Sequence, residues 1–192
     1  TYWPYLRKKY GLRDEQLRPY TFNMAPFLAD KNAVQQGFLS SEPYSIAQAL
    51  GQPPEVLLIA DAGFSAYQTT IAISAKMAAE KKDLVQRFVE ATLEGWAQYL
   101  RGGPATDAAN ALIKQHNPDQ TDARIVYAIK VLNERGIVFS GDALNGGIGA
   151  MSRARWKDFY DSMVDVDVLP KGLDVDRAYT LEFVNKGIGK PT

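Results

Sequence analysis

The sequence predicts an α/β protein, because brief strand-like segments alternate with short helical segments in its first part and long amphipathic helices fill the rest. The strand-like segments are rich in β-branched or aromatic residues and are bounded by Gly, Pro, Asn or Ser, which is the pattern expected of strands. We expect these strands at residues 19–23, 38–40, 56–60 and 66–74.

Three short helices are expected before and between the first strands. They cover residues 2–10, 26–36 and about 44–50. A glycine follows each of them directly, and the third is also followed by Pro53-Pro54. Glycine just past the last turn, with proline shortly beyond it, is the usual signal that ends a helix.

One long helix dominates the middle of the chain. From Asp83 the apolar residues recur at the helical period, until Gly102-Gly103-Pro104 ends the pattern. Asp83 and Gln86 have the spacing of a capping box at the start of this helix. The apolar stripe, which we expect to lie in the core, consists of Leu84, Val85, Phe88, Val89, Leu93, Trp96, Tyr99 and Leu100.

Three further helices are expected in the second half. Two cover residues 106–116 and 121–135, the latter opened by Thr121 and closed by Gly136. Ser152 is expected to cap a final helix, because an apolar face at the helical period follows it. That core-facing side consists of Trp156, Phe159, Tyr160, Met163 and Val164.

Composition excludes several classes of function. The 192 residues contain 22 Lys and Arg and 22 Asp and Glu, so no basic excess of the kind used to bind nucleic acid is present, and we expect no nucleic-acid partner. No apolar run is long enough to span a membrane. The absence of cysteine excludes disulfides, thiolate catalysis and zinc–thiolate sites.

Because the chain starts at Thr1 without Met or a signal sequence, we expect it to lack its N-terminal part.

Catalytic constellations are scarce in this sequence. The single histidine, His116, falls at the end of an expected helix, where an exposed structural role is the ordinary one. Gly146-Gly147-Ile148-Gly149 lacks the spacing of a phosphate-binding loop and is interpreted as a structural turn. We therefore expect no catalytic residue, no metal site and no cofactor.

Candidate ligand-binding residues gather where expected strands end. Ser41, Glu42 and Tyr44 follow the strand at 38–40, and in open α/β sheets ligands bind beyond the carboxyl ends of strands. The alternative is that Ser41 and Glu42 only stabilise the start of a helix, and spacing alone does not decide between the two.

Aromatic residues gather in two loop-like places. Tyr2 and Trp3 begin the chain, and Phe64 and Tyr67 follow Asp61. Loop aromatics with a polar atom suit stacking on a planar ligand, although such residues more often pack in a core. We include all five residues in the candidate site.

An ordered set of segments carries a family resemblance across nearly the whole chain. The segments are 38–44 (FLSSEPY), 58–64 (LIADAGF), 69–74 (TTIAIS), 84–89 (LVQRFV) with Gly95-Trp96, 145–151 (NGGIGAM) with Arg155-Trp156, and 178–184 (AYTLEFV). Together they resemble the nitrate/sulfonate/taurine-type solute-binding proteins of ABC transporters, in particular the branch grouped with the yeast thiamine-pyrimidine synthase.

The resemblance implies a type II periplasmic-binding-protein-like fold with two α/β lobes and a ligand cleft between them. By this analogy residues 1–60 form the later part of the second lobe. Residues 61–67 cross between the lobes, and residues 68–192 form the C-terminal part of the first lobe. The opening strands of the first lobe are absent from this sequence, which agrees with the expected loss of the N-terminal part.

The resemblance also implies a function: an extracytoplasmic, periplasmic component of an ABC importer that captures a small molecule and delivers it to a membrane permease. A carboxylate at Glu42 favours an amino-bearing ring such as an amino-pyrimidine over an inorganic anion, because two buried negative groups repel each other. One alternative is a thiamine-pyrimidine synthase-like enzyme, but in the family that chemistry relies on an active-site histidine and a cysteine-rich motif. The other is a ligand-sensing ectodomain.

Overall fold

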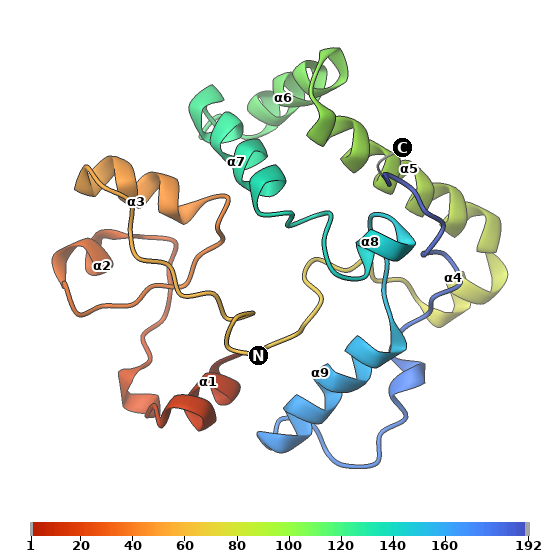
Figure 1. Ribbon diagram of the computed structural model, residues 1–192, viewed down its shortest axis with the longest axis horizontal. Coiled ribbons are helices and arrows are strands. Elements are labelled where there is room, and N and C mark those ends of the chain that lie inside the picture. Colours follow the sequence, from red (N-terminus) through yellow and green to blue (C-terminus); the bar gives the residue numbers. More distant parts are fainter. Residues whose placement is uncertain (1, 191–192) are drawn as a thin grey trace. The chain divides into compact units, whose positions relative to one another are not determined.

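The computed structural model describes residues 2–190, and all regular structure in this range is helical. Figure 1 shows the order of the elements along the chain. The helices are α1 Tyr2–Tyr10, η1 Asp14–Gln16, α2 Ala25–Ala29, α3 Glu42–Leu50, α4 Ala75–Glu80, α5 Lys82–Arg101, α6 Pro104–His116, α7 Asp122–Glu134, α8 Ala143–Gly146, α9 Arg153–Asp165 and η2 Val175–Arg177. None of the described helices is both long and apolar enough to cross a membrane.

The chain divides into two compact units. The first unit contains the described residues within Thr1–Leu17, Leu57–Trp96 and Gly141–Thr192. The second unit contains Arg18–Val56 and Ala97–Ser140. The predicted lobes, 1–60 and 68–192 joined by 61–67, refer to the complete family fold and stay a prediction.

Most helix predictions are confirmed, because their start and stop signals are local. α1 ends before Gly11, which has a positive φ of 65°, and α3 ends at Gly51 with φ 72°. The side chains of Thr121 and Ser152 cap α7 and α9 by accepting hydrogen bonds from the backbone N–H three residues on. These caps satisfy amide groups that the first turn of a helix leaves without partners.

Two details of the helix predictions are wrong. The helix expected at 26–36 is only α2, because Asp30 turns the chain: its carboxylate accepts the N–H of Asn32 at 2.9 Å. Asp side chains offer the backbone such alternatives to a helix. Asp83 does not cap α5, since the helix already includes Lys82, and the Asp83 carboxylate instead pairs with Arg87 at 2.9 Å.

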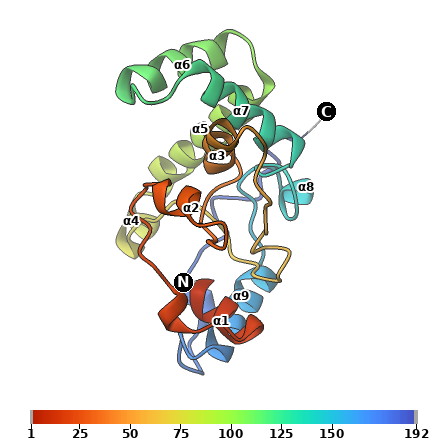
Figure 2. The ribbon, with the colours of Figure 1, turned by 90° about the vertical axis from the view of Figure 1, so that its left-hand side faces the viewer.

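The predicted strands are not formed within residues 2–190, and Figures 1 and 2 draw no strand arrow there. Phe22 and Thr69 have positive φ angles of 59° and 55°, which interrupt the extended runs expected at 19–23 and 66–74. Residues 58–63 form successive turns, with Asp61 N–H donating to Leu58 C=O at 3.1 Å. A strand is stabilised by its neighbours, and these segments have none here. The α/β class is therefore not confirmed in the described chain.

One part of the core of the first unit lies on one side of α5. Val85, Val89 and Leu93 of this helix are each no more than 7% exposed. Met163 of α9, which is 1% exposed, is another buried residue of the same unit. The neighbouring row of α5 was predicted to be buried as well, but Leu84, Phe88 and Trp96 are between 40% and 59% exposed. The apolar stripe of α5 is thus wider than the surface that covers it.

The C-terminal segment of the first unit packs on the glycine-rich turn. The Ile148 N–H donates to the Ile188 carbonyl at 2.7 Å, and the Gly187 N–H donates to the Gly146 carbonyl at 2.9 Å. A Cβ on Gly147 would lie 2.6 Å from backbone atoms of Gly187 and Ile188. This packing confirms that residues 146–149 form a structural turn.

The second unit has a smaller set of buried residues. Ile46 of α3 and Ile125 of α7 are each 5% exposed, and so is Thr106 of α6, whose hydroxyl donates to the Tyr99 carbonyl at 2.8 Å. Arg124 of α7 donates to the Ser45 hydroxyl at 3.0 Å. The Arg124–Ser45 bond joins α7 to α3, and the Thr106–Tyr99 bond joins α6 to the end of α5.

Candidate functional site

The eight candidate residues fall in both units. Ser41, Glu42 and Tyr44 belong to the second unit. Tyr2, Trp3, Asp61, Phe64 and Tyr67 belong to the first. Each group is therefore described within its own unit.

Glu42 is the first residue of α3, and its carboxylate closes the loop that precedes the helix. One oxygen, Oε2, accepts the backbone N–H of Phe38 at 2.7 Å. The loop passes so close to the side chain that a Cβ on Gly37 would lie 2.8 Å from the Cβ of Glu42. The local sequence therefore fixes the position of this half-buried carboxylate.

The second carboxylate oxygen of Glu42 bonds to Tyr20, one member of an aromatic pair. Tyr20 donates its hydroxyl to Oε1 at 3.2 Å, and the rings of Tyr20 and Phe22 lie 5.1 Å apart. Partial burial raises the pKa of the Tyr20 phenol, and the negative charge of Glu42 raises it further. We call Tyr20, Phe22 and Glu42 the Glu42 cluster.

Sequence reasoning did not find Tyr20 or Phe22 as site residues. Both were assigned to a strand, whereas Phe22 has a left-handed backbone and is 87% exposed. Two aromatic residues in the short run PYTFN were the available signal. The contact of Tyr20 with Glu42 joins residues 22 apart in sequence, and no spacing rule predicts it.

The other two candidates of the second unit differ in role. Ser41 precedes α3, is exposed and makes no capping hydrogen bond through its side chain, so the alternative role as a side-chain N-cap is not supported. Its role in ligand binding stays a prediction. Tyr44 packs its ring 5.2 Å from that of Tyr127, whose hydroxyl donates to the Leu39 carbonyl at 3.2 Å. Tyr44 thus contributes to the contact between α3 and α7, and its role in ligand binding stays a prediction.

Tyr67 of the first unit lies in a polar and aromatic cluster. Its hydroxyl donates to the Asp142 carboxylate and accepts the backbone N–H of Ser152 at 2.7 Å. Burial raises the pKa of Tyr67, the bond to Asp142 raises it further, and the bond from Ser152 opposes these effects. The Arg155 guanidinium lies 4.2 Å from the centre of the ring, which is within cation–π range.

Arg155 and Trp156 of α9 complete this cluster. Arg155 donates to the carbonyls of Ser65 and Ala66 at 2.7 and 3.1 Å, and so fixes the backbone just before Tyr67. The Trp156 ring stacks parallel to that of Tyr179, with centroids 5.0 Å apart, and its Nε1 is buried without a hydrogen-bond partner in the described structure. The contacts of Arg155 thus attach residues 65–67 to α9.

Phe64 and Asp61 lie in very different surroundings. Phe64 is 8% exposed and packs between the rings of Tyr5 and Phe159, at centroid distances of 5.4 and 5.6 Å. The protein therefore leaves little of this side chain open to a ligand. Asp61 is exposed in the turn that precedes it. The predicted binding role of both residues stays a prediction.

Tyr2 and Trp3 are half-buried at the start of α1. Burial raises the pKa of Tyr2. Trp3 Nε1 donates to Asp14 at 2.7 Å, a bond that lowers the pKa of Asp14, as the nearby Arg7 also does. The Trp3 side chain is thus held by the loop that follows its own helix.

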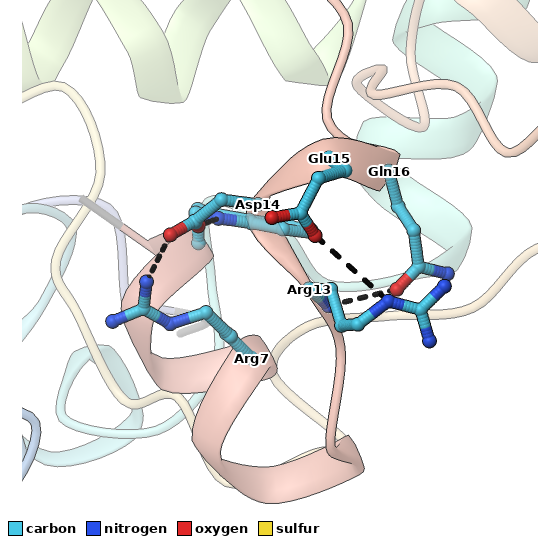
Figure 3. Close-up of polar contacts among 6 residues, drawn as sticks. Arg7, Arg13, Asp14, Glu15 and Gln16 are labelled. Atoms are coloured by element: carbon cyan, nitrogen blue, oxygen red, sulfur yellow. Dashed lines mark hydrogen bonds and ion pairs between the residues drawn. The ribbon is translucent and has the colours of Figure 1, made fainter.

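Figure 3 shows the polar contacts of that loop. Arg7 pairs with Asp14, the backbone N–H of Arg13 donates to Gln16 at 2.7 Å, and the Arg13 side chain lies 3.8 Å from Glu15. These groups are exposed and are satisfied by one another. They therefore stabilise the turn after α1.

Metal-ligating side chains do not converge within residues 2–190. No group of three or more His, Asp or Glu side chains in this range could hold a metal ion. His116 is exposed at the last position of α6, where a basic residue interacts favourably with the helix dipole. In the second unit, the candidate carboxylate of Glu42 contacts one aromatic residue, Tyr20.

Comparison with known proteins identifies the family. The family model described as "NMT1/THI5 like" matches residues 4–105, more than half of the chain. The chain therefore belongs to the NMT1/THI5-like family, which has a periplasmic-binding-protein-like fold.

One curated relative gives a further indication. The chain is 30% identical over 165 residues to a protein of Chloroflexus aurantiacus named riboflavin-binding protein RibY. The match covers 85% of this chain and 45% of the relative, so the chain spans less than half of the relative's length. No solved structure matches the chain significantly. Family and relative together support a solute-binding role.

Proposed function

We propose that this chain is an extracytoplasmic solute-binding component of an ABC importer and that its ligand is an amino-bearing nitrogen heterocycle. The observation that carries the proposal is the Glu42 cluster, in which a fixed carboxylate bonds to Tyr20, whose ring lies 5.1 Å from that of Phe22. Membership of the NMT1/THI5-like family and the name of the Chloroflexus relative support binding of an organic ring compound.

The chemistry of Glu42 selects the kind of ligand. In the free protein each oxygen of the carboxylate accepts one hydrogen bond, Oε2 from the backbone N–H of Phe38 and Oε1 from the hydroxyl of Tyr20. The group accepts hydrogen bonds and donates none. A ligand that presents N–H groups therefore gains bonds here, whereas a nitrate or sulfonate brings a second negative charge and is disfavoured.

Two ring classes differ in how well they fit this acceptor. An aminopyrimidine presents an exocyclic amino group and so offers a strong donor at its edge. The ring system of riboflavin presents one ring N–H between two carbonyls, whose oxygens would face the carboxylate unfavourably. We therefore propose an aminopyrimidine as the first ligand to test and riboflavin, which the relative's name indicates, as the second.

The proposed mechanism is capture without chemistry. Two lobes close around the ligand and exclude water, hinge residues absorb the movement, and the closed form docks on a membrane permease in the periplasm.

The family also includes a synthase, and a synthase-like enzymatic activity is the first alternative to this function. We favour binding because the sequence has no cysteine and a single histidine, His116. A ligand-sensing ectodomain is the second alternative, and it would bind the same ligand without a permease.

Calorimetric titration of the purified protein and two Glu→Gln variants tests the proposal. Glu42→Gln keeps the size of the side chain but removes its charge, and a hydrogen bond to a charged group contributes about 1.5–3 kcal/mol, so we expect affinity for the aminopyrimidine to fall at least about tenfold. Glu55→Gln is the matched control, because Glu55 is exposed in the same unit. Equal affinity of the wild type and Glu42→Gln would contradict the assigned role of Glu42.

A further inference from the structure

The two oxygens of the Glu42 carboxylate are held in different ways. Oε2 bonds to the N–H of Phe38, four residues away in the same loop, at 2.7 Å. Oε1 bonds to the hydroxyl of Tyr20, 22 residues away, at 3.2 Å. The first bond is short and local, whereas the second is long for an O–H donor and depends on a separate segment.

The segment that carries Tyr20 is built to move at low cost. Residues 18–23 lie outside every helix, and all of them except Tyr20 are exposed. Phe22 has a φ of 59°, a conformation that a bulky residue adopts only under strain. Segments with few buried contacts open locally with little free energy.

We infer that Tyr20 is a specificity-determining residue of the Glu42 site, because its hydroxyl covers Oε1 in the free protein and an N–H group of the ligand replaces it on binding. This inference rests on the proposed function. We call the Tyr20 hydroxyl, in its bond to Oε1, the cover. Only a ligand whose hydrogen-bond donor competes with a phenol O–H for Oε1 can displace it. The Phe38 bond meanwhile keeps the carboxylate in place, so the site needs no other rearrangement to accept the ligand.

The bond between Tyr20 and Oε1 should lower the affinity of the site for the ligand by a measurable factor. A site that is open in only a fraction of the molecules binds with an affinity reduced by that fraction, so a cover closed in about nine of ten molecules weakens binding about tenfold. Tyr20→Phe removes the hydroxyl and keeps the ring. We therefore expect this substitution to tighten binding of the aminopyrimidine by about three- to tenfold.

Calorimetric titration with the aminopyrimidine compares the wild type with Tyr20→Phe and with the control variant Tyr10→Phe. Tyr10 is a suitable control because it lies on α1 of the other unit and is 57% exposed. Tighter binding in Tyr20→Phe, with Tyr10→Phe unchanged, would support the inference. Equal or weaker binding in Tyr20→Phe would overturn it and leave the proposed function standing. Absence of binding in all three proteins would overturn the proposed function and the inference with it.

A ligand-free measurement tests the cover separately. The phenol of Tyr20, followed by NMR of labelled tyrosine, should titrate at lower pH in Glu42→Gln than in the wild type, because the substitution removes the neighbouring negative charge. An unchanged titration would show that the two side chains do not meet in solution. That result would overturn the inference whatever the binding data show.

Discussion

The first and second units hold their candidate residues in contrasting ways. Tyr67 of the first unit is enclosed by Asp142, Ser152 and Arg155, which come from the loop before α8 and from the start of α9. Glu42 of the second unit is held by one local bond and one bond to an irregular segment. The first unit therefore holds its candidate tyrosine with three partners, whereas the second holds Glu42 with two hydrogen bonds, and our proposal is that one of these two exchanges for the ligand.

The largest effect expected from this contrast concerns two phenylalanines. Phe183→Ala empties a site that is 4% exposed beside α5, and large-to-small changes of this kind cost about 3–5 kcal/mol. Phe22→Ala removes a ring that is 87% exposed, and surface changes stay within about 0.5 kcal/mol. Urea unfolding followed by circular dichroism measures both. Comparable losses in the two variants would contradict the difference between the units.

A second prediction concerns two glycines that have similar φ angles. Gly147 and Gly172 have φ angles of 86° and 84°, but only at Gly147 would a Cβ meet backbone atoms, at 2.6 Å. Gly172→Ala should cost about 1 kcal/mol for the left-handed conformation. Gly147→Ala should cost about 1–3 kcal/mol more, because the C-terminal segment must also move. If urea unfolding gave equal transition midpoints for Gly147→Ala and Gly172→Ala, the C-terminal segment would not pack on the glycine-rich turn.

The smallest expected effect is electrostatic. Hydrogen bonds from Arg153 and Tyr179 hold the pKa of Asp176 below its ordinary value. A carboxylate whose pKa is lower in the folded state stabilises the fold above its unfolded pKa of about 3.9, and this contribution is lost as the pH falls through the folded value. Asp176→Asn should therefore make the acid-induced loss of stability shallower between about pH 5 and pH 2. Asp119→Asn, at an exposed position of the second unit, is the matched control for the loss of one carboxylate, and an equal effect of both variants would contradict the assigned role of the Arg153 and Tyr179 bonds.

Helix ends could be predicted from the sequence because their signals are local. Thr121 and Ser152 cap the helices that they were expected to cap, and Gly51 ends α3. Strands could not be predicted in the same way, because a strand depends on hydrogen bonds to a neighbour that sequence propensity does not reveal. The segment 66–74 has a strand-like composition but forms no strand here.

The candidate site shows the same limit. Glu42 was found because it follows a short apolar segment at the start of a helix, which is a local pattern. Tyr20 was missed because its contact with Glu42 spans 22 residues. Phe64 met the criterion of an aromatic residue in a loop, but the rings of Tyr5 and Phe159 cover it, and such packing depends on tertiary structure alone.

The central claim is that this protein binds an amino-bearing heterocycle, and a thermal-shift panel tests it most directly. A ligand that binds only the folded state stabilises it by about 2.7 kcal/mol at a hundredfold excess over the dissociation constant. The panel contains an aminopyrimidine, riboflavin, taurine, a sulfonate and nitrate. We predict that the aminopyrimidine raises the melting temperature of the wild type and has little effect on Glu42→Gln. Stabilisation by the anions, with none by either ring compound, would contradict the account.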